Sequence, residues 1–163
     1  LMVVRADSDI QSLEQLEGRT IAFPAPKAFA ATLLTQAHLR KKGVSFQAKY
    51  VSSHDSVYQS VARGLYSAGG GIVRTLDNMP KATRDQLRVL WLSDGYTPHA
   101  VAVSPELDEQ TAATIQKELV KLDETEAGRV LLEALNMNGF EAATDADWDD
   151  VRDLNISVSG AGH

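Results

Sequence analysis

Ser52, Ser53, His54 and Asp55 are the residues of this chain whose types and spacing first suggest chemistry. A hydrolytic triad needs a nucleophile, a base and an orienting acid in line, and adjacent residues at a helix start cannot form that line. The segment leaves an expected strand and opens an expected helix, where free N–H groups and the helix dipole attract anions. Two interpretations stay open: His54 donates to a bound oxyanion, or Ser53 only caps the helix and His54 is only solvated.

A second segment, Pro24–Ala30, holds the same position after the preceding expected strand. In an open parallel sheet, ligands bind in the crevice outside the carboxyl ends of the strands. Lys27, Ala28, Phe29 and Ala30 are therefore further candidates for ligand binding. The alternative is that the segment is a plain turn between a strand and a helix.

The glycine run Gly69-Gly70-Gly71 fits neither phosphate-loop pattern, because no G-x-x-x-x-G-K-[ST] is present and Arg74 stands where the dinucleotide pattern requires glycine. Glycines inside a strand more often permit the close approach of another backbone or of a ligand. We take Gly70 and Arg74 as candidate ligand-binding residues, with a solvated Arg74 as the alternative.

The acidic segment Asp145–Asp150 resembles a calcium loop in composition only. The EF-hand loop requires Gly where Asp150 stands and Glu where Ile156 stands. The five aspartates between residues 145 and 153 indicate a solvated helix start instead. The four histidines show no metal-ligand spacing, so we expect no metal site, no cofactor and no catalytic residue.

Composition excludes several classes of protein. The chain has 163 residues, a formal net charge of −6, 44% hydrophobic residues and no cysteine. The acidic balance argues against sequence-independent binding of nucleic acid, and no run of 18 apolar residues is present that would span a membrane. The lack of cysteine excludes disulfides, thiolate metal sites and cysteine nucleophiles.

Strand and helix patterns alternate up to about residue 92. The expected helices are a short one at 12–18, with Ser12 and Gln15 as a capping box and Gly18 as its end, then 27–42, 54–63 and one or two short helices within 75–86. The alternation predicts an α/β fold, a mainly parallel sheet with helices on both faces. The expected strands are residues 1–5, 20–23, 47–51, 68–73, 88–92 and 100–104.

Beyond Ser104 the pattern becomes helical. Ser104-Pro105 signals a helix start, and we expect helices near 108–122, around 131–135 and at 147–154, followed by a flexible tail at 157–163. These helices carry apolar faces but no strands of their own. We expect a second copy of the chain or the chain's own sheet to bury that face, which consists of Ile115, Leu119, Leu122, Leu131 and Leu135.

The chain opens on a strand-like run, Leu1–Arg5, with no signal-peptide pattern, which indicates that it begins inside a larger protein. Five runs carry a resemblance to a known family by their order and spacing: Arg5-Ala6-Asp7-Ser8-Asp9-Ile10, Ser12–Phe23, Ser53–Val57, Val61–Gly64 and Ala68–Gly71. With these runs the chain resembles the phosphate/phosphite/phosphonate-type solute-binding proteins of ABC importers.

The resemblance implies the type 2 periplasmic-binding fold, in which two α/β lobes joined by crossing strands clamp a ligand between them. On that template residues 1–104 are the second lobe with its hinge strands, near 1–5 and 98–104. Residues 105–156 are a C-terminal helical segment that docks on a first lobe whose initial part is absent here. The expected role is a non-enzymatic, periplasmic or extracytoplasmic solute-binding domain that serves the membrane subunits of an ABC importer. The alternative is the ligand-sensing domain of a membrane histidine kinase.

The resemblance carries over only part of the ligand site. His54 matches a ligand-contacting histidine of the phosphonate receptors. Their Ser-Thr-Ser helix start falls on Ala28-Phe29-Ala30, and their acidic contact falls on Ile72 or Val73. Each lost hydrogen bond to a charged ligand is worth roughly 1.5–3 kcal/mol. We therefore expect a small anionic ligand but poor affinity for phosphonate itself.

Overall fold

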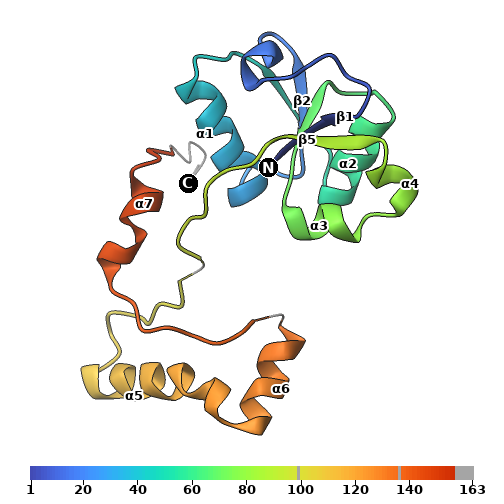
Figure 1. Ribbon diagram of the computed structural model, residues 1–163. Coiled ribbons are helices and arrows are strands. Elements are labelled where there is room, and N and C mark those ends of the chain that lie inside the picture. Colours follow the sequence, from blue (N-terminus) through green and yellow to red (C-terminus); the bar gives the residue numbers. More distant parts are fainter. Residues whose placement is uncertain (99, 136, 157–163) are drawn as a thin grey trace. The chain divides into compact units, whose positions relative to one another are not determined.

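The computed structural model describes residues 1–98, 100–135 and 137–156 (Figure 1). The chain divides into two compact units. The first, which we call the α/β unit, comprises Leu1–Gly95, with the segment from Arg152 assigned to it as well. The second, which we call the helical unit, comprises Tyr96–Val151. Which segment belongs to which lobe of a two-lobed receptor stays a prediction.

The α/β unit is built on a five-stranded sheet of order β3-β2-β4-β1-β5. β2 pairs in parallel with both β3 and β4, whereas β1 pairs antiparallel with both β4 and β5. Since β4 and β5 are both antiparallel to β1, four of the five strands run in one direction. The strands are β1 Met2–Arg5, β2 Thr20–Phe23, β3 Gln47–Tyr50, β4 Ala68–Gly70 and β5 Leu87–Trp91.

The predicted α/β class, with a sheet that is parallel at its centre, is confirmed. One detail departs from the mainly parallel expectation, because β1 inserts between β4 and β5 and runs antiparallel to both. Val3 pairs with Gly69 on one side and with Val89 on the other. Both partners are distant in sequence, so local pattern carries no information about this insertion.

Helices cover both faces of the sheet (Figure 1). Successive side chains of a strand point to opposite faces, and Met2 and Val4 lie in one core cluster while Leu1 and Val3 lie in the other. The first cluster includes Leu39 of α1, and the second includes Tyr58 and Val61 of α2. The helices of this unit are η1 Leu13–Leu16, η2 Phe29–Leu33, α1 Leu34–Lys41, α2 His54–Ala62, α3 Val73–Asn78 and α4 Lys81–Arg84.

The glycine run allows two helices to approach β4 closely, as its composition predicted. A Cβ on Gly69 would lie 2.4 Å from Cγ1 of Val57, and one on Gly71 would lie 2.1 Å from the hydroxyl of Tyr58. A Cβ on Gly70 would lie 2.1 Å from the carbonyl oxygen of Ala31. Consecutive glycines therefore meet α2 and η2 alternately, which places these two helices on opposite faces of β4.

The helix predicted over 27–42 begins later and less regularly than expected. Pro24 to Pro26 interrupt the chain, and the first turn is the π-helix η2. The N–H groups of Thr32 and Leu33 both donate to the carbonyl of Ala28, at 2.9 and 3.1 Å. The α-helical pattern is established only from Leu34.

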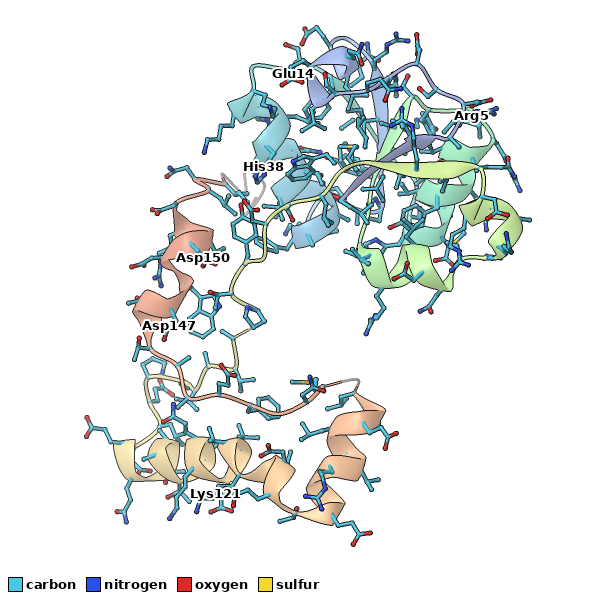
Figure 2. The ribbon with its side chains drawn as sticks, in the orientation of Figure 1. Arg5, Glu14, His38, Lys121, Asp147 and Asp150 are labelled. Carbon is cyan, nitrogen blue, oxygen red and sulfur yellow. The ribbon has the colours of Figure 1, made fainter. Side chains whose placement is uncertain are left out.

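Several other local predictions are confirmed. Gln15 Oε1 accepts from the N–H of Ser12 at 3.2 Å, as a capping box requires, although the turn is 3-10 rather than α-helical. Gly18 has φ +69° and Gly64 has φ +72°, the left-handed conformation that ends helices at glycine. The sequence did not predict one further contact, in which the ring of His38 in α1, labelled in Figure 2, lies 4.6 Å from the ring of Trp91 on β5.

The helical unit contains α5 Glu109–Val120, η3 Leu122–Glu124, α6 Glu126–Ala134, η4 Asp145–Trp148 and α7 Asp149–Arg152, whose last residue belongs to the other unit. Asp108 caps α5 by accepting from Thr111 N–H, and Thr125 caps α6 by accepting from Gly128 N–H. Ser104-Pro105 forms a turn ahead of α5 rather than its first residues.

The helical unit does not bury its own apolar face among its described residues. Among its described residues only Gly128 and Leu132 are buried, while Ile115, Leu131 and Leu135 are 40, 59 and 61% exposed. Burial of these residues by the chain's own sheet stays a prediction, since the sheet belongs to the other unit. Burial by a second copy stays a prediction as well.

Two further expectations concern this region. The strand predicted at 100–104 is wrong: residues 100–104 form no strand, since no described strand lies beside them to accept their hydrogen bonds. The tail predicted at 157–163 lies outside the described residues. In the part of the chain that the structure describes, no helix combines the length and apolar character that a membrane crossing needs.

Candidate functional site

The carboxyl ends of β3, β2 and β4 meet at one edge of the sheet, because these three neighbouring strands are parallel. The candidate segments follow those three ends. Ser52–Asp55 follows β3, Lys27–Ala30 follows β2, and Gly70 with Arg74 marks the end of β4. The fold thus brings the three candidate segments to one edge of the sheet, which we call the carboxyl edge.

The start of α2 is shaped by Ser52 and Ser53. Ser52 has φ +71°, a left-handed conformation that costs a non-glycine residue roughly 1–2 kcal/mol. Ser53 is the N-cap: its Oγ accepts from Ser56 N–H at 3.1 Å and donates to Ser56 Oγ at 2.8 Å. Both hydrogen bonds of the Ser53 hydroxyl are thus made to Ser56, in the first turn of α2. The N–H groups of the first helical turn have no acceptor within the helix.

His54, the first residue of α2, holds an unpaired polar atom. Its side chain is half-buried, and its Nδ1 is buried without any hydrogen-bond partner. A buried nitrogen without a partner costs free energy unless a ligand or water completes it. The interpretation that the His54 side chain is only solvated does not fit its Nδ1, because that atom is buried.

The start of η2 offers backbone donors and no free side-chain donor. Ala28 is the N-cap, in an extended conformation, and Phe29, Ala30 and Ala31 form the first turn. The nearest hydroxyl belongs to Thr32, is fully buried, and donates to the carbonyl of Ala25 at 2.8 Å. This bond fixes the loop after β2 against the helix that follows it.

The exit of β4 is fixed by Tyr58 of α2. The Tyr58 hydroxyl donates to the carbonyl of Ile72 at 2.7 Å. Burial raises the pKa of Tyr58 to about 12; the bond to Ile72 acts in the opposite direction, and the charges of Asp77 and Asp55 raise it further. The phenol is therefore neutral at physiological pH and donates its proton to the loop that leads from Gly71 to α3.

The two helices that flank the carboxyl edge lie on opposite faces of neighbouring strands. η2 follows β2 on one face, whereas α3 follows β4 on the other, where Leu76 and Met79 pack with Tyr58. Such a change of face between adjacent parallel strands opens a crevice at their carboxyl ends, the usual place for a ligand in an open α/β sheet.

Charged side chains of both signs lie at this edge. Lys27 and Arg74 are exposed, and neither has a hydrogen-bond or ion-pair partner among the described residues. Asp55 is exposed in the first turn of α2. Two cations, one carboxylate and the positive ends of the helix dipoles make the edge favourable to an anion.

No side chain at the carboxyl edge is paired as a nucleophile with a base, since Ser53 is bonded to Ser56 and not to His54. Among the described residues no cluster of three acidic or histidine side chains is placed to hold a metal ion. In the acidic segment, Thr144 N–H bonds to Asp147 and lowers the pKa of that carboxyl, as expected of a capped helix start.

The sequence analysis did not identify Thr32 and Tyr58, whose hydroxyl groups position the loops after β2 and β4. Tyr58 lies four residues after His54, on the helical face that also carries Val61, which is the spacing of a core residue. Thr32 carries no motif. Their roles depend on contacts with Ile72 and Ala25, which sequence spacing does not reveal.

A surface hollow of about 500 Å³ lies in the helical unit. None of the predicted site residues lines it. Its walls are Arg129, Leu132, Glu133, Met137 and Asn138. The carboxyl edge of the α/β unit remains the candidate site, because it combines unpaired donors with positive charge.

Comparison with known families gives a match over most of the chain. The sequence profile of the family described as "ABC transporter, phosphonate, periplasmic substrate-binding protein" matches residues 1–148. The matched range includes every candidate site residue and continues through α5 and α6.

Three solved structures illustrate the shared fold. XAC2383 from Xanthomonas citri, solved with chloride, is 22% identical, with a TM-score of 0.78 over 94% of this chain and 62% of that chain. PhnD1 from Prochlorococcus marinus, solved with methylphosphonate, is 18% identical, with a TM-score of 0.75 over 95% of this chain and 64% of that chain. The binding protein component of a phosphonate ABC transporter from Pseudomonas aeruginosa is 18% identical, with a TM-score of 0.67 over 95% of this chain and 55% of that chain. The chain thus spans less than two thirds of the length of each of them.

Proposed function

This chain belongs to the periplasmic substrate-binding proteins of phosphonate ABC transporters, and we propose that it is the ligand-holding lobe of an extracytoplasmic receptor for a small anion. The anion is phosphonate- or phosphate-like, and the receptor passes it to the membrane subunits of an importer. The role requires binding and release and no chemical step. Closure of two lobes around the ligand is the mechanical response that the fold supports.

The observation that carries the proposal is the buried, unpaired Nδ1 of His54 at the start of α2. Protonated at Nδ1, His54 donates one hydrogen bond to an oxyanion. The N–H groups of the first turns of α2 and η2 supply further donors without any side chain. Lys27 and Arg74 add positive charge at the same edge.

The test is calorimetric titration of the full-length protein with phosphate, phosphite and methylphosphonate. A hydrogen bond to a charged group is worth roughly 1.5–3 kcal/mol, so His54→Ala should weaken the best of these ligands by about 10- to 100-fold. His38→Ala is the matched control, because His38 Nδ1 is bonded to the carbonyl of Leu34 within α1. An anion that binds tightly to wild type and equally to His54→Ala would show that the site is wrong.

The histidine-kinase sensing role is the second hypothesis. It uses the same ligand site and differs in the output, so the titration serves both. The gene's neighbours and the domains encoded beside this one separate the two roles: an importer operon supports transport, and a kinase in the same reading frame supports sensing.

A further inference from the structure

The chain crosses between its two units twice. The first crossing lies between Gly95 and Tyr96, and the second lies between Val151 and Arg152. A hinge between two compact bodies consists of a few loop or element-terminal residues that absorb the change in backbone angles. The residues beside these two crossings are therefore the ones that set how the units can turn.

The first crossing combines a flexible residue with a stiff pair. Gly95 is exposed, and a Cβ built there would meet nothing within 4 Å, so no neighbour crowds it. Three residues later, the ring of Pro98 fixes its φ angle, and Thr97 before it is restricted to extended conformations. The chain can thus turn at Gly95 but is stiff at Thr97 and Pro98.

Hydrogen bonds tie this stiff pair to the acidic segment just before the second crossing, where Asp147 and Asp150 are labelled in Figure 2. The N–H of Thr97 donates to Oδ2 of Asp150 at 2.7 Å. The Thr97 hydroxyl lies 2.7 Å from the carbonyl oxygen of Asp147 and 3.2 Å from the same Oδ2 of Asp150. Nε1–H of Trp148 donates to the carbonyl of Pro98 at 2.8 Å. We call this group of bonds the clasp.

The clasp joins the two ends of a unit that has little core. Among the described residues of the helical unit only Gly128 and Leu132 are buried, and both belong to α6. Hydrogen bonds rather than a packed core therefore hold the first and last segments of this unit together. Thr97 and Trp148 are half-buried, and a bond from an N–H to a carboxylate is stronger than one between neutral groups.

We propose that the clasp joins the two crossings into a single hinge, so that the helical unit turns as one body about Gly95. Thr97, Trp148 and Asp150 are positioning residues in this hinge. Without the clasp, each crossing bends by itself and the units take up many more relative orientations. The proposal involves no ligand, so it stands or fails independently of the proposed anion site.

The test measures the distance between one spin label in each unit by pulsed electron paramagnetic resonance. The chain contains no cysteine, so the labels attach only at Lys49→Cys in β3 and Lys117→Cys in α5, both exposed positions. The distance distribution of the otherwise unchanged chain should be narrow. Asp150→Ala should widen it about twofold or more, because the crossings then bend independently. Thr97→Val, which keeps the N–H bond and loses the hydroxyl, should widen it less.

Two variants serve as controls. Thr97→Ser keeps the hydroxyl and should keep the narrow distribution. Asp153→Ala makes the same change of charge three residues beyond Asp150, at a carboxylate that takes no part in the clasp, and should also keep it. Circular dichroism of each variant checks that its helices are formed.

Three results would overturn the proposal. One is a distribution for the otherwise unchanged chain that is as broad as that of Asp150→Ala. Another is equal broadening by Asp150→Ala and Asp153→Ala, which would mean that charge and not the clasp matters. The third is a loss of helical signal in Asp150→Ala, because the bonds would then be needed to fold the helical unit rather than to join its crossings.

Discussion

The two units of this chain have equally well-formed helix ends but very different interiors. In the α/β unit Ser53 caps α2, and in the helical unit Thr125 caps α6, each by accepting an N–H three residues on. Yet the first unit buries residues of every strand of its sheet except the edge strand β3, whereas the described part of the second buries only Gly128 and Leu132. Local capping defines where helices begin, and tertiary burial decides whether they are stable.

The chain carries a natural reporter for this comparison. It has two tryptophans, Trp91 in β5 and Trp148 in the helical unit. A Trp148→Phe background reports unfolding of the α/β unit alone, and a Trp91→Phe background reports unfolding of the helical unit. The predictions below use these backgrounds with urea denaturation unless another measurement is named.

The largest effect is expected from removing core volume in the α/β unit. Leu16 is fully buried, and Leu16→Ala should lower the free energy of unfolding by about 3 kcal/mol. The matched change in the other unit, Leu131→Ala, removes the same atoms from a side chain that is 59% exposed. It should change the free energy by less than about 0.5 kcal/mol. Similar losses in both would mean that α6 is covered in solution, as a second copy of the chain would cover it.

A smaller effect is expected from adding volume beside the site. Gly70→Ala forces a methyl group against the Ala31 carbonyl and should cost about 2 kcal/mol, measured as a lower urea midpoint in the Trp148→Phe background. Gly95→Ala is the control, since a Cβ there meets nothing within 4 Å. Equal midpoints for the two variants would contradict the close approach of η2 to β4.

The contribution of Tyr58 to the stability of the α/β unit is expected to depend on pH. Tyr58→Phe removes the bond to Ile72 and should cost about 1 kcal/mol at pH 8. Because the pKa of Tyr58 is raised to about 12 in the folded chain and is about 10 when unfolded, its contribution is complete below pH 10 and is lost as the pH rises through 12.

The difference between wild type and Tyr58→Phe should therefore shrink between pH 10 and 12, as followed by urea midpoints. Tyr50→Phe removes a hydroxyl from a side chain that is 42% exposed and is the control for the loss of a tyrosine hydroxyl. A difference that stays constant over this range would show that the Tyr58 hydroxyl is accessible to water.

The smallest effect is expected at the helix caps. Ser53→Ala removes the acceptor for Ser56 N–H and should cost about 1 kcal/mol in the Trp148→Phe background. Thr125→Ala removes the equivalent acceptor for Gly128 N–H. It should lower the helical signal in circular dichroism without moving the midpoint of the α/β unit. A midpoint shift as large as that of Ser53→Ala would show that the two units unfold together.

The sequence predicted those parts of the fold that depend on local pattern. The strands 20–23 and 47–51, the helix beginning at His54 and the close packing at Gly69–Gly71 follow from turn residues, caps and the lack of a Cβ. The antiparallel insertion of β1 was missed because both of its partners are distant in sequence. Val101 and Val103 alternate as strand residues do, but a strand also needs a neighbour, and the pattern alone does not supply one.

The candidate site was predicted to a similar extent. The order of strands and helices brought Ala28, His54 and Gly70 to one edge, as the rule for open parallel sheets predicts. The sequence did not reveal which hydroxyls remain free, because Thr32 is bonded to the carbonyl of Ala25 and Ser53 to Ser56. Nor did it reveal that Nδ1 of His54 is buried and unpaired.

The position of β1 also bears on how the chain folds as it is synthesised. Met2 pairs with Gly70 and with Trp91, so β1 leaves the ribosome well before either of its neighbours. Until β4 and β5 arrive, the apolar run Met2-Val3-Val4 has both of its hydrogen-bonding edges open, and such strands are templates for aggregation. The inner position of β1 in the sheet is therefore completed only after Gly70 and Trp91 have been synthesised.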